Sequence, residues 1–216
     1  MMSRIVAIGL LLGLCGPAWA GFEEGLAAYR RYDYAAALEE WRPLAEQGDA
    51  NAQYYLGELY QQGRGVRREV ATAVDWYRMA AEQGQVDAQL RLAELYEAGR
   101  GVPRDVAEAA RWLLEAARRG HAEAMYRLGL KYAAGEGVTR DLVQAHKWLS
   151  LAVPRGGNVT GFLAQTRLRD VAGAMTPEQI RKAEDLAGAW KPENGTRITG
   201  GPAKRPAESS DAEPAG

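Results

Sequence analysis

The chain has 216 residues, with 27 lysines and arginines against 28 aspartates and glutamates, and a single cysteine, Cys15. A formal net charge of −1 provides no overall basic field, so the composition does not favour nucleic-acid binding. The length is typical of one ordinary domain or slightly more.

The first twenty residues are typical of an export signal. Arg4 gives a positive start, residues 5–14 are apolar, and residues 18–20 have the small-x-small pattern of a cleavage site. An uncleaved membrane anchor is the alternative, but the apolar run is too short to span a bilayer. We therefore predict that residues 1–20 are a cleaved signal peptide and that the protein is exported, either to the periplasm or out of the cell. The mature chain would contain no cysteine, so helix packing would have to stabilise it.

Residues 21–48 predict a pair of helices that precedes the repeats described next. Tyr29 belongs to the first helix, residues 34–38 and Trp41 begin the second, and Asp33 is placed to cap it. The segment resembles a plain tetratricopeptide hairpin. It is expected to form an atypical terminal unit with one solvated face.

Residues 49–156 contain three copies of one 36-residue unit, at 49–84, 85–120 and 121–156, aligned without a gap. Self-similarity at such a period indicates stacked supersecondary units. The recurring positions are Ala52, Ala88 and Ala124; Leu56, Leu92 and Leu128; Tyr60, Tyr96 and Tyr132; Gly63, Gly99 and Gly135; Gly65, Gly101 and Gly137; Ala73, Ala109 and Ala145; and Trp76, Trp112 and Trp148.

Each unit predicts two helices joined by a turn. In the first unit, Ala52 and Leu56 fall on the apolar side of a helical wheel, and Tyr55 and Glu58 fall on the polar side. The two glycines of the Gly-x-Gly motif end this helix, because they lower helix propensity and allow positive φ. A second helix follows, and the tryptophan position lies on its buried stripe.

The starts of the second helices differ in quality. Asp105 with Glu108, and Asp141 with Gln144, have the spacing of a capping box. The first unit has Glu69 at this position, so its second helix is expected to start less sharply. We assign Trp76, Trp112 and Trp148 to the seam between helices, as structural residues of the repeat, and not to a ligand-stacking ladder.

These shared positions resemble the Sel-one-like repeat, a relative of the tetratricopeptide repeat, over residues 49–156. The departures are few: Ala93 replaces a glycine, Val153 replaces an alanine, and Lys131 replaces a leucine. Lys131 suggests that the third unit is more open at this point. The resemblance implies an all-α, right-handed α-solenoid of antiparallel helix pairs, with about ten helices.

Residues 157–192 have the length of another unit but lack the turn motif. A helix is predicted over residues 159–171, and a second starts at Thr176, with Pro177 at its first position and Gln179 at its third. We expect these two capping helices to cover the open face of the third unit. Residues 193–216 have a composition that predicts a disordered tail.

The residue patterns give little indication of chemistry. His121 and His146 have no partner at metal-ligand spacing, so we expect solvated surface histidines and no metal site. The Gly-x-Gly turns follow a helix and not a strand, so they are predicted to be structural, not phosphate-binding. We predict no cofactor and no catalytic residue.

The polar side of the first helices is the candidate binding surface, since it varies among copies whose packing positions do not vary. In related solenoids the first helices line a concave wall. Tyrosine and arginine are common anchors of interfaces. The candidate partner-binding residues are Asn51, Tyr55, Glu58, Gln62, Asp87, Arg91, Glu94, Glu123, Arg127 and Leu130.

Similarity to the Sel-one-like family implies a non-enzymatic scaffold that binds a peptide or protein along this wall. We expect a monomer that binds neither nucleic acid nor a membrane as a stable span. The alternative is a binder or hydrolase of a small molecule or cell-wall fragment, with Glu58 and Glu94 as carboxylates of the site.

Overall fold

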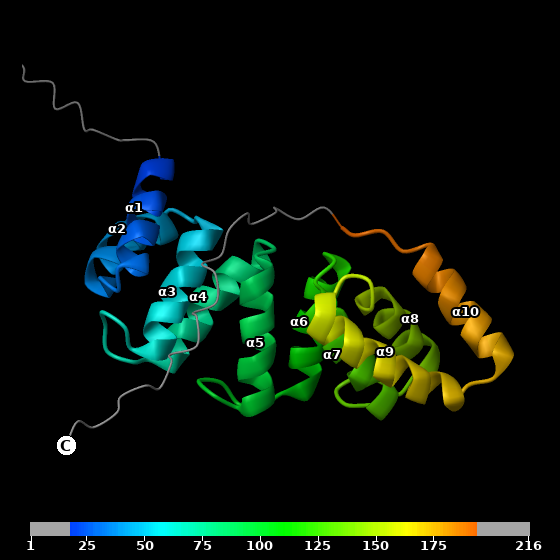
Figure 1. The fold of residues 1–216 in the computed structure, drawn as a ribbon. Coiled ribbons are helices and arrows are strands. Elements are labelled where there is room, and N and C mark those ends of the chain that lie inside the picture. The colour runs from blue at the N-terminus through cyan, green and yellow to red at the C-terminus, as the bar shows by residue number, and fades with distance from the viewer. Residues whose placement is uncertain (1–17, 194–216) are drawn as a thin grey trace, which may run out of the picture.

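The computed structural model describes residues 18–193, which form ten α-helices and no strand (Figure 1). The all-α repeat architecture predicted from the sequence is confirmed. The helices are α1 (Ala18–Arg30), α2 (Tyr34–Glu46), α3 (Ala50–Gln62), α4 (Val70–Glu82), α5 (Val86–Ala98), α6 (Val106–Arg118), α7 (Ala122–Ala134), α8 (Leu142–Ala152), α9 (Gly157–Gly173) and α10 (Pro177–Gly188).

Helices adjacent in sequence pack together, and the helix pairs follow one another along the molecule (Figure 1). The second helix of each unit also packs against the first helix of the next, as α4 does with α5 and α6 does with α7. At the C-terminal end, α9 packs against α7 and α8, whereas α10 packs against α8. Both capping helices therefore lie against the third unit.

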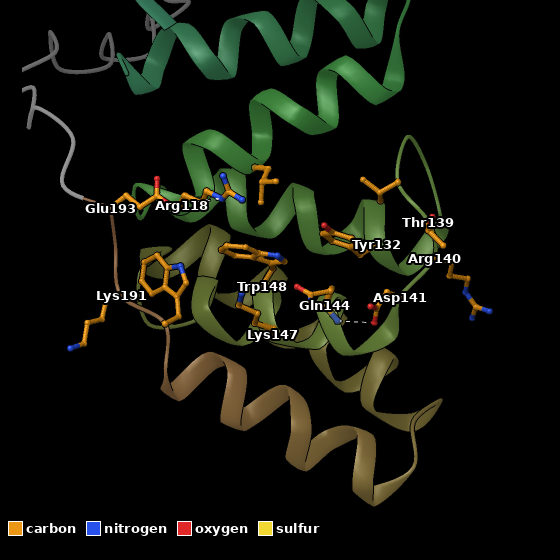
Figure 2. A pocket seen from close by; sticks show the side chains of 13 residues that line it. Arg118, Tyr132, Thr139, Arg140, Asp141, Gln144, Lys147, Trp148, Lys191 and Glu193 are labelled. Atoms are coloured by element: carbon orange, nitrogen blue, oxygen red, sulfur yellow. Dashed lines mark hydrogen bonds and ion pairs between the residues drawn. The ribbon is translucent and has the colours of Figure 1, made fainter. Parts of the chain in front are cut away.

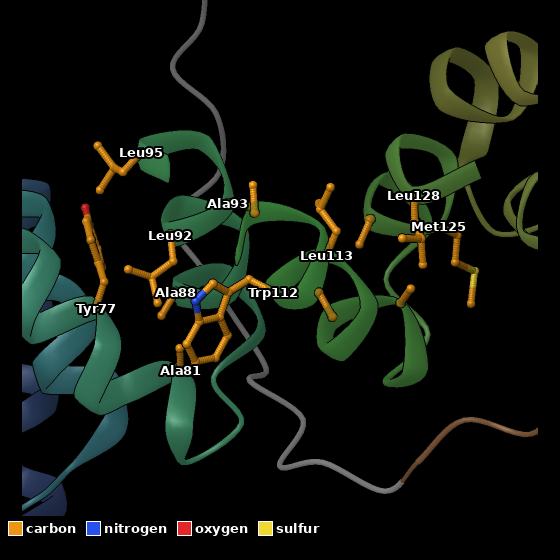
Figure 3. Close-up of a cluster of buried hydrophobic side chains, with 14 of the residues drawn as sticks. Tyr77, Ala81, Ala88, Leu92, Ala93, Leu95, Trp112, Leu113, Met125 and Leu128 are labelled. Carbon is orange, nitrogen blue, oxygen red and sulfur yellow. The ribbon is translucent and has the colours of Figure 1, made fainter. Parts of the chain in front are cut away.

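A continuous apolar core runs from α4 to α8. It joins Leu92 of α5, Leu113 of α6 and Leu128 of α7 (Figure 3). The alanine positions of the repeat let helix backbones approach closely because their side chains are small and fully buried. They are Ala52, Ala73, Ala88, Ala109, Ala124 and Ala145. A second cluster joins α1, α2 and α3.

Two of the three repeat tryptophans are buried as predicted, with 3% of Trp112 and 3% of Trp148 exposed. Trp76 is only partly buried, against the N-terminal cluster, so its assignment to the core was too strong. The residue before each tryptophan explains the difference. A cation lies over the ring of Trp112, from Arg111, and over that of Trp148, from Lys147, while the corresponding residue before Trp76 is an aspartate.

The second glycine of the turn motif joins successive units. Gly101 has φ +75°, and a Cβ added to it would lie 2.8 Å from the carbonyl oxygen of Val70, at the start of the second helix of the preceding unit. Gly137 has φ +73°, and its Cβ would collide with the carbonyl oxygen of Val106 in the same way. Only glycine satisfies both the backbone angle and the close approach.

The helix starts largely follow the predictions. Asp105 and Asp141 accept hydrogen bonds from backbone N–H groups of α6 and α8, but Glu108 pairs with Arg111 and does not complete a capping box. Glu69 makes no side-chain cap, in agreement with the weaker start predicted for α4. The capping box at Thr176 is complete.

The predicted signal peptide lies outside the described residues, except that residues 18–20 form the first turn of α1. The predicted tail lies outside them from residue 194 onwards. Within residues 18–193, none of the helices combines the length and the apolar character that crossing a bilayer requires.

The contact at Gly137 leads to a stability prediction. Gly137→Ala should lower the free energy of unfolding by about 1–3 kcal/mol, because alanine is strained at positive φ and its methyl group meets the backbone of α6. Gly173→Ala is the matched control, since Gly173 ends α9 and an added Cβ there has no neighbour within 4 Å. Urea unfolding followed by circular dichroism would measure both, and equal midpoints for the two variants would contradict this role of the turn.

Candidate interaction surface

Charged side chains from successive first helices form ion pairs with one another. The Arg91 guanidinium on α5 lies 3.0 Å from the Glu58 carboxylate on α3 and 3.1 Å from the Glu94 carboxylate on its own helix. Glu94 in turn lies 3.4 Å from Arg127 on α7. Each arginine therefore bridges two units.

Two further pairs extend this row at α7. Arg127 contacts Glu97 at 2.7 Å, and the ammonium group of Lys131 contacts the other oxygen of Glu97, also at 2.7 Å. We call the whole set the ion-pair ladder. It comprises Glu58, Arg91, Glu94, Glu97, Arg127 and Lys131.

The two ends of the ladder are buried. Glu58 is 7% exposed and Lys131 is 7% exposed, whereas Arg91 and Glu94 in the middle reach solvent. The buried hydroxyl of Tyr77 donates a hydrogen bond to Glu58, at 2.9 Å. Burial and the charge of Glu58 both raise the pKa of Tyr77, so its hydroxyl remains a donor.

Glu97 is the acidic centre of the ladder on the α7 side. Burial alone would raise the pKa of its carboxyl group, but hydrogen bonds from Lys131 and the charges of Arg127 and Lys131 outweigh burial and hold the pKa below its usual value. Sequence reasoning missed Glu97. A lysine in a leucine position, as Lys131 is, was the available signal that an acidic partner lies in the preceding unit.

Lys131 was expected to open the third unit, and this was wrong. Its side chain is buried and paired, so it ties α7 to α5. The physical reason is that a long side chain at this position can bury its stem and still place its charge on a carboxylate of the neighbouring helix.

Tyr55 was predicted on the polar surface, and this was also wrong. It is 5% exposed and stacks on Trp41 of α2, with ring centres 4.6 Å apart. Phe22 and Tyr29 of α1 contact it as well. Burial raises the pKa of Tyr55 to about 12. This residue holds the N-terminal helix pair against the first repeat.

The other candidate residues differ in how far they reach solvent. Gln62 and Glu123 are exposed, while Asn51, Asp87 and Leu130 are half-buried. Gln62 donates a hydrogen bond to the Glu58 carboxylate, at 2.7 Å. We use the term first-helix face for the surface of α3, α5 and α7 that carries the ladder and these residues.

The histidines were expected to be solvated, and the structure corrects this. His146 is 5% exposed, and burial lowers its pKa. His121 is half-buried and caps α7, where its Nδ1 accepts a hydrogen bond from the Ala124 N–H. Burial lowers the pKa of His121 as well.

The carboxylates of the alternative hydrolytic site are already engaged. Glu58 accepts hydrogen bonds from Tyr77 and Gln62 and pairs with Arg91. Glu94 pairs with arginines of two helices. Such surroundings favour the charged carboxylate, whereas a general acid must hold a proton.

Comparison with known proteins agrees with the repeat geometry. The family model described as Sel1 repeat matches residues 50–85, 86–121 and 122–153. This is a Sel1 repeat protein. Sel1 repeats generally mediate protein–protein interactions. No curated protein matches the chain.

Two solved structures resemble the whole arrangement. The Sel1 repeat protein from Oxalobacter formigenes is 32% identical, with a TM-score of 0.62 over 64% of this chain and 57% of that one. The protein c5321 is a protective antigen of uropathogenic Escherichia coli with an SLR fold. It is 27% identical, with a TM-score of 0.53 over 86% of this chain and 51% of that one. The Sel1 repeat protein therefore spans little more than half the length of either relative.

The ladder predicts a pH-dependent contribution to stability from Glu97. Because its pKa is lower in the folded than in the unfolded chain, the contribution is present above the ordinary value of about 4.3 and is lost as the pH falls through the folded pKa. Glu97→Gln should lower the free energy of unfolding at pH 7 by roughly 1–3 kcal/mol, since it leaves buried Lys131 without its counter-charge.

Urea unfolding at pH 7 and at pH 3 would measure this effect. Glu82→Gln is the control, because Glu82 is exposed and makes no ion pair with any described residue, so its effect should stay within about 0.5 kcal/mol. A Glu97→Gln effect that is the same at both pH values would contradict the assignment.

Proposed function

We propose that this Sel1 repeat protein is a non-catalytic adaptor of the cell envelope that binds a peptide or partner protein along its first-helix face. Membership of the Sel1 repeat family supports the class of function. The export signal read from residues 1–20 supports the location.

The observation that carries the proposal is the ion-pair ladder. It fixes Arg91, Glu94 and Arg127 in a row that crosses successive units, and Arg91 and Glu94 keep 38% and 37% of their side chains exposed. Charged groups that are already held in place lose little rotamer freedom on binding. A partner that lies across the row would therefore meet an ordered surface.

The exposed residues beside the ladder supply the variable part of this face. Gln62 and Glu123 reach solvent, with Glu123 one helical turn before Arg127. The corresponding positions differ among the three repeats, while the alanine and leucine positions do not. Repeat proteins commonly recognise partners through such variable residues on a constant framework.

Photo-crosslinking in the envelope of the native host tests this proposal. A photoreactive residue in place of Gln62 or Glu123 should give the same covalent adduct with one partner. The matched positions Glu82 on α4 and Glu178 on α10 are exposed polar sites on second helices, and they should give none. Equal adducts from both sets, or none from the first set, would contradict a partner on the first-helix face.

A further inference from the structure

A pocket of about 750 Å³ lies away from the ladder, between α6, α8, the turn before α8 and the segment that follows α10 (Figure 2). Leu114, Tyr132 and Trp148 form its apolar and aromatic lining. From α7 the pocket uses Tyr132, which is rotated around the helix from the ladder residue Lys131. It is therefore a separate site.

The C-terminal segment closes one side of this pocket. The backbone N–H of Glu193 donates a hydrogen bond to the carbonyl oxygen of Arg118, at 2.8 Å. The ring of Trp190 meets the ring of Trp148 edge-on, with centres 6.4 Å apart, and the Arg155 guanidinium lies over Trp190. These contacts fix residues 190–193 against the third repeat.

The charges that line the pocket are unbalanced. Arg118, Arg140, Lys147 and Lys191 stand against Asp141 and Glu193. Asp141 is occupied as the cap of α8, where it accepts hydrogen bonds from two backbone N–H groups. Glu193 contacts Arg118 only at 3.9 Å.

Lys147 is the cation whose charge the structure leaves without an acidic partner. It forms no ion pair with any residue in 18–193, and its ammonium group lies 4.4 Å from the ring centre of Trp148. In the view of Figure 2, Trp148 lies between Arg118 and Lys147. Burial lowers the pKa of Lys147, and the positive charge of Arg118 lowers it further. A bound anion would relieve both effects.

A second observation at the same place indicates a ligand. The indole N–H of Trp148 is shielded from solvent and has no hydrogen-bond acceptor among the described residues, although 97% of the residue is buried, given its exposure of 3%. Figure 2 shows the nitrogen edge of its ring directed across the pocket, toward Tyr132 and Gln144. A buried polar group without a partner is uncommon in native structures.

The charge arrangement is particular to the third repeat. The residues that correspond to Arg118 and Lys147 in the first repeat are Glu82 and Asp75. The ordinary needs of repeat packing therefore do not require these two cations. Their presence beside aromatic rings is the combination that recognises carboxylates on a polypeptide.

We propose that this pocket binds an acidic segment of a partner polypeptide, with Lys147 and Arg118 as anchors for a carboxylate and Trp148 and Trp190 as the wall on which the segment packs. This site is independent of the first-helix face, so one molecule of the adaptor could hold two partners.

Isothermal titration calorimetry of the full chain at low salt tests the proposal, with a capped peptide of six glutamates as the probe. The wild type should bind the peptide, and Lys147→Gln with Arg118→Gln should weaken the affinity at least tenfold. Arg31→Gln with Arg67→Gln removes the same charge from exposed arginines elsewhere and should leave the affinity unchanged. Binding should also weaken as salt is raised.

The capped peptide of six glutamines, free glutamate and inorganic phosphate complete the design, and none of them should bind comparably. Equal affinity for glutamate or phosphate would overturn the proposal in favour of a small-anion site. Equal affinity of the two double variants, or no binding by the wild type, would overturn it outright. Thermal unfolding of each variant shows whether a loss of binding reflects a loss of folding.

Discussion

The close packing of small and apolar side chains between consecutive helices is the interaction on which the rest of this structure depends. Fully buried alanines such as Ala88 and Ala109 let the helices approach, and Leu92, Leu113 and Leu128 fill the space between them. The core passes from α4 to α8 without interruption. No unit encloses a core of its own, so each helix pair depends on its neighbours for stability.

This packing decides what remains for the surface. The row of charges on the first helices is internally matched, with three acidic and three basic groups in contact across units, so it can stiffen the face as well as present it. The pocket at the third repeat is different, because its cations outnumber its acids. One fold thus carries a neutral, ordered face and a separate cationic pocket.

The periodicity made the helices, the turns and most of the buried positions predictable from the sequence, because one unit repeats with the same spacing. Tyr55, Lys131 and His146 were not predictable in this way. A helix in a solenoid contacts its own partner and also the units before and after it, so a two-sided helical wheel assigns too many residues to solvent. Tyr55 meets α1 and α2, and Lys131 reaches Glu97 of the preceding unit. The pocket depends on residues 190–193 folding back on α6, which no local pattern encodes.

Amide hydrogen exchange on a Leu92→Ala variant tests most directly whether stability is shared between neighbouring units. Leu92 is fully buried on α5, within the continuous core. If the units depend on one another, protection should fall in α4, α5 and α6 together, and α10 should keep its protection. Loss of protection confined to α5, or spread equally to α10, would contradict the account.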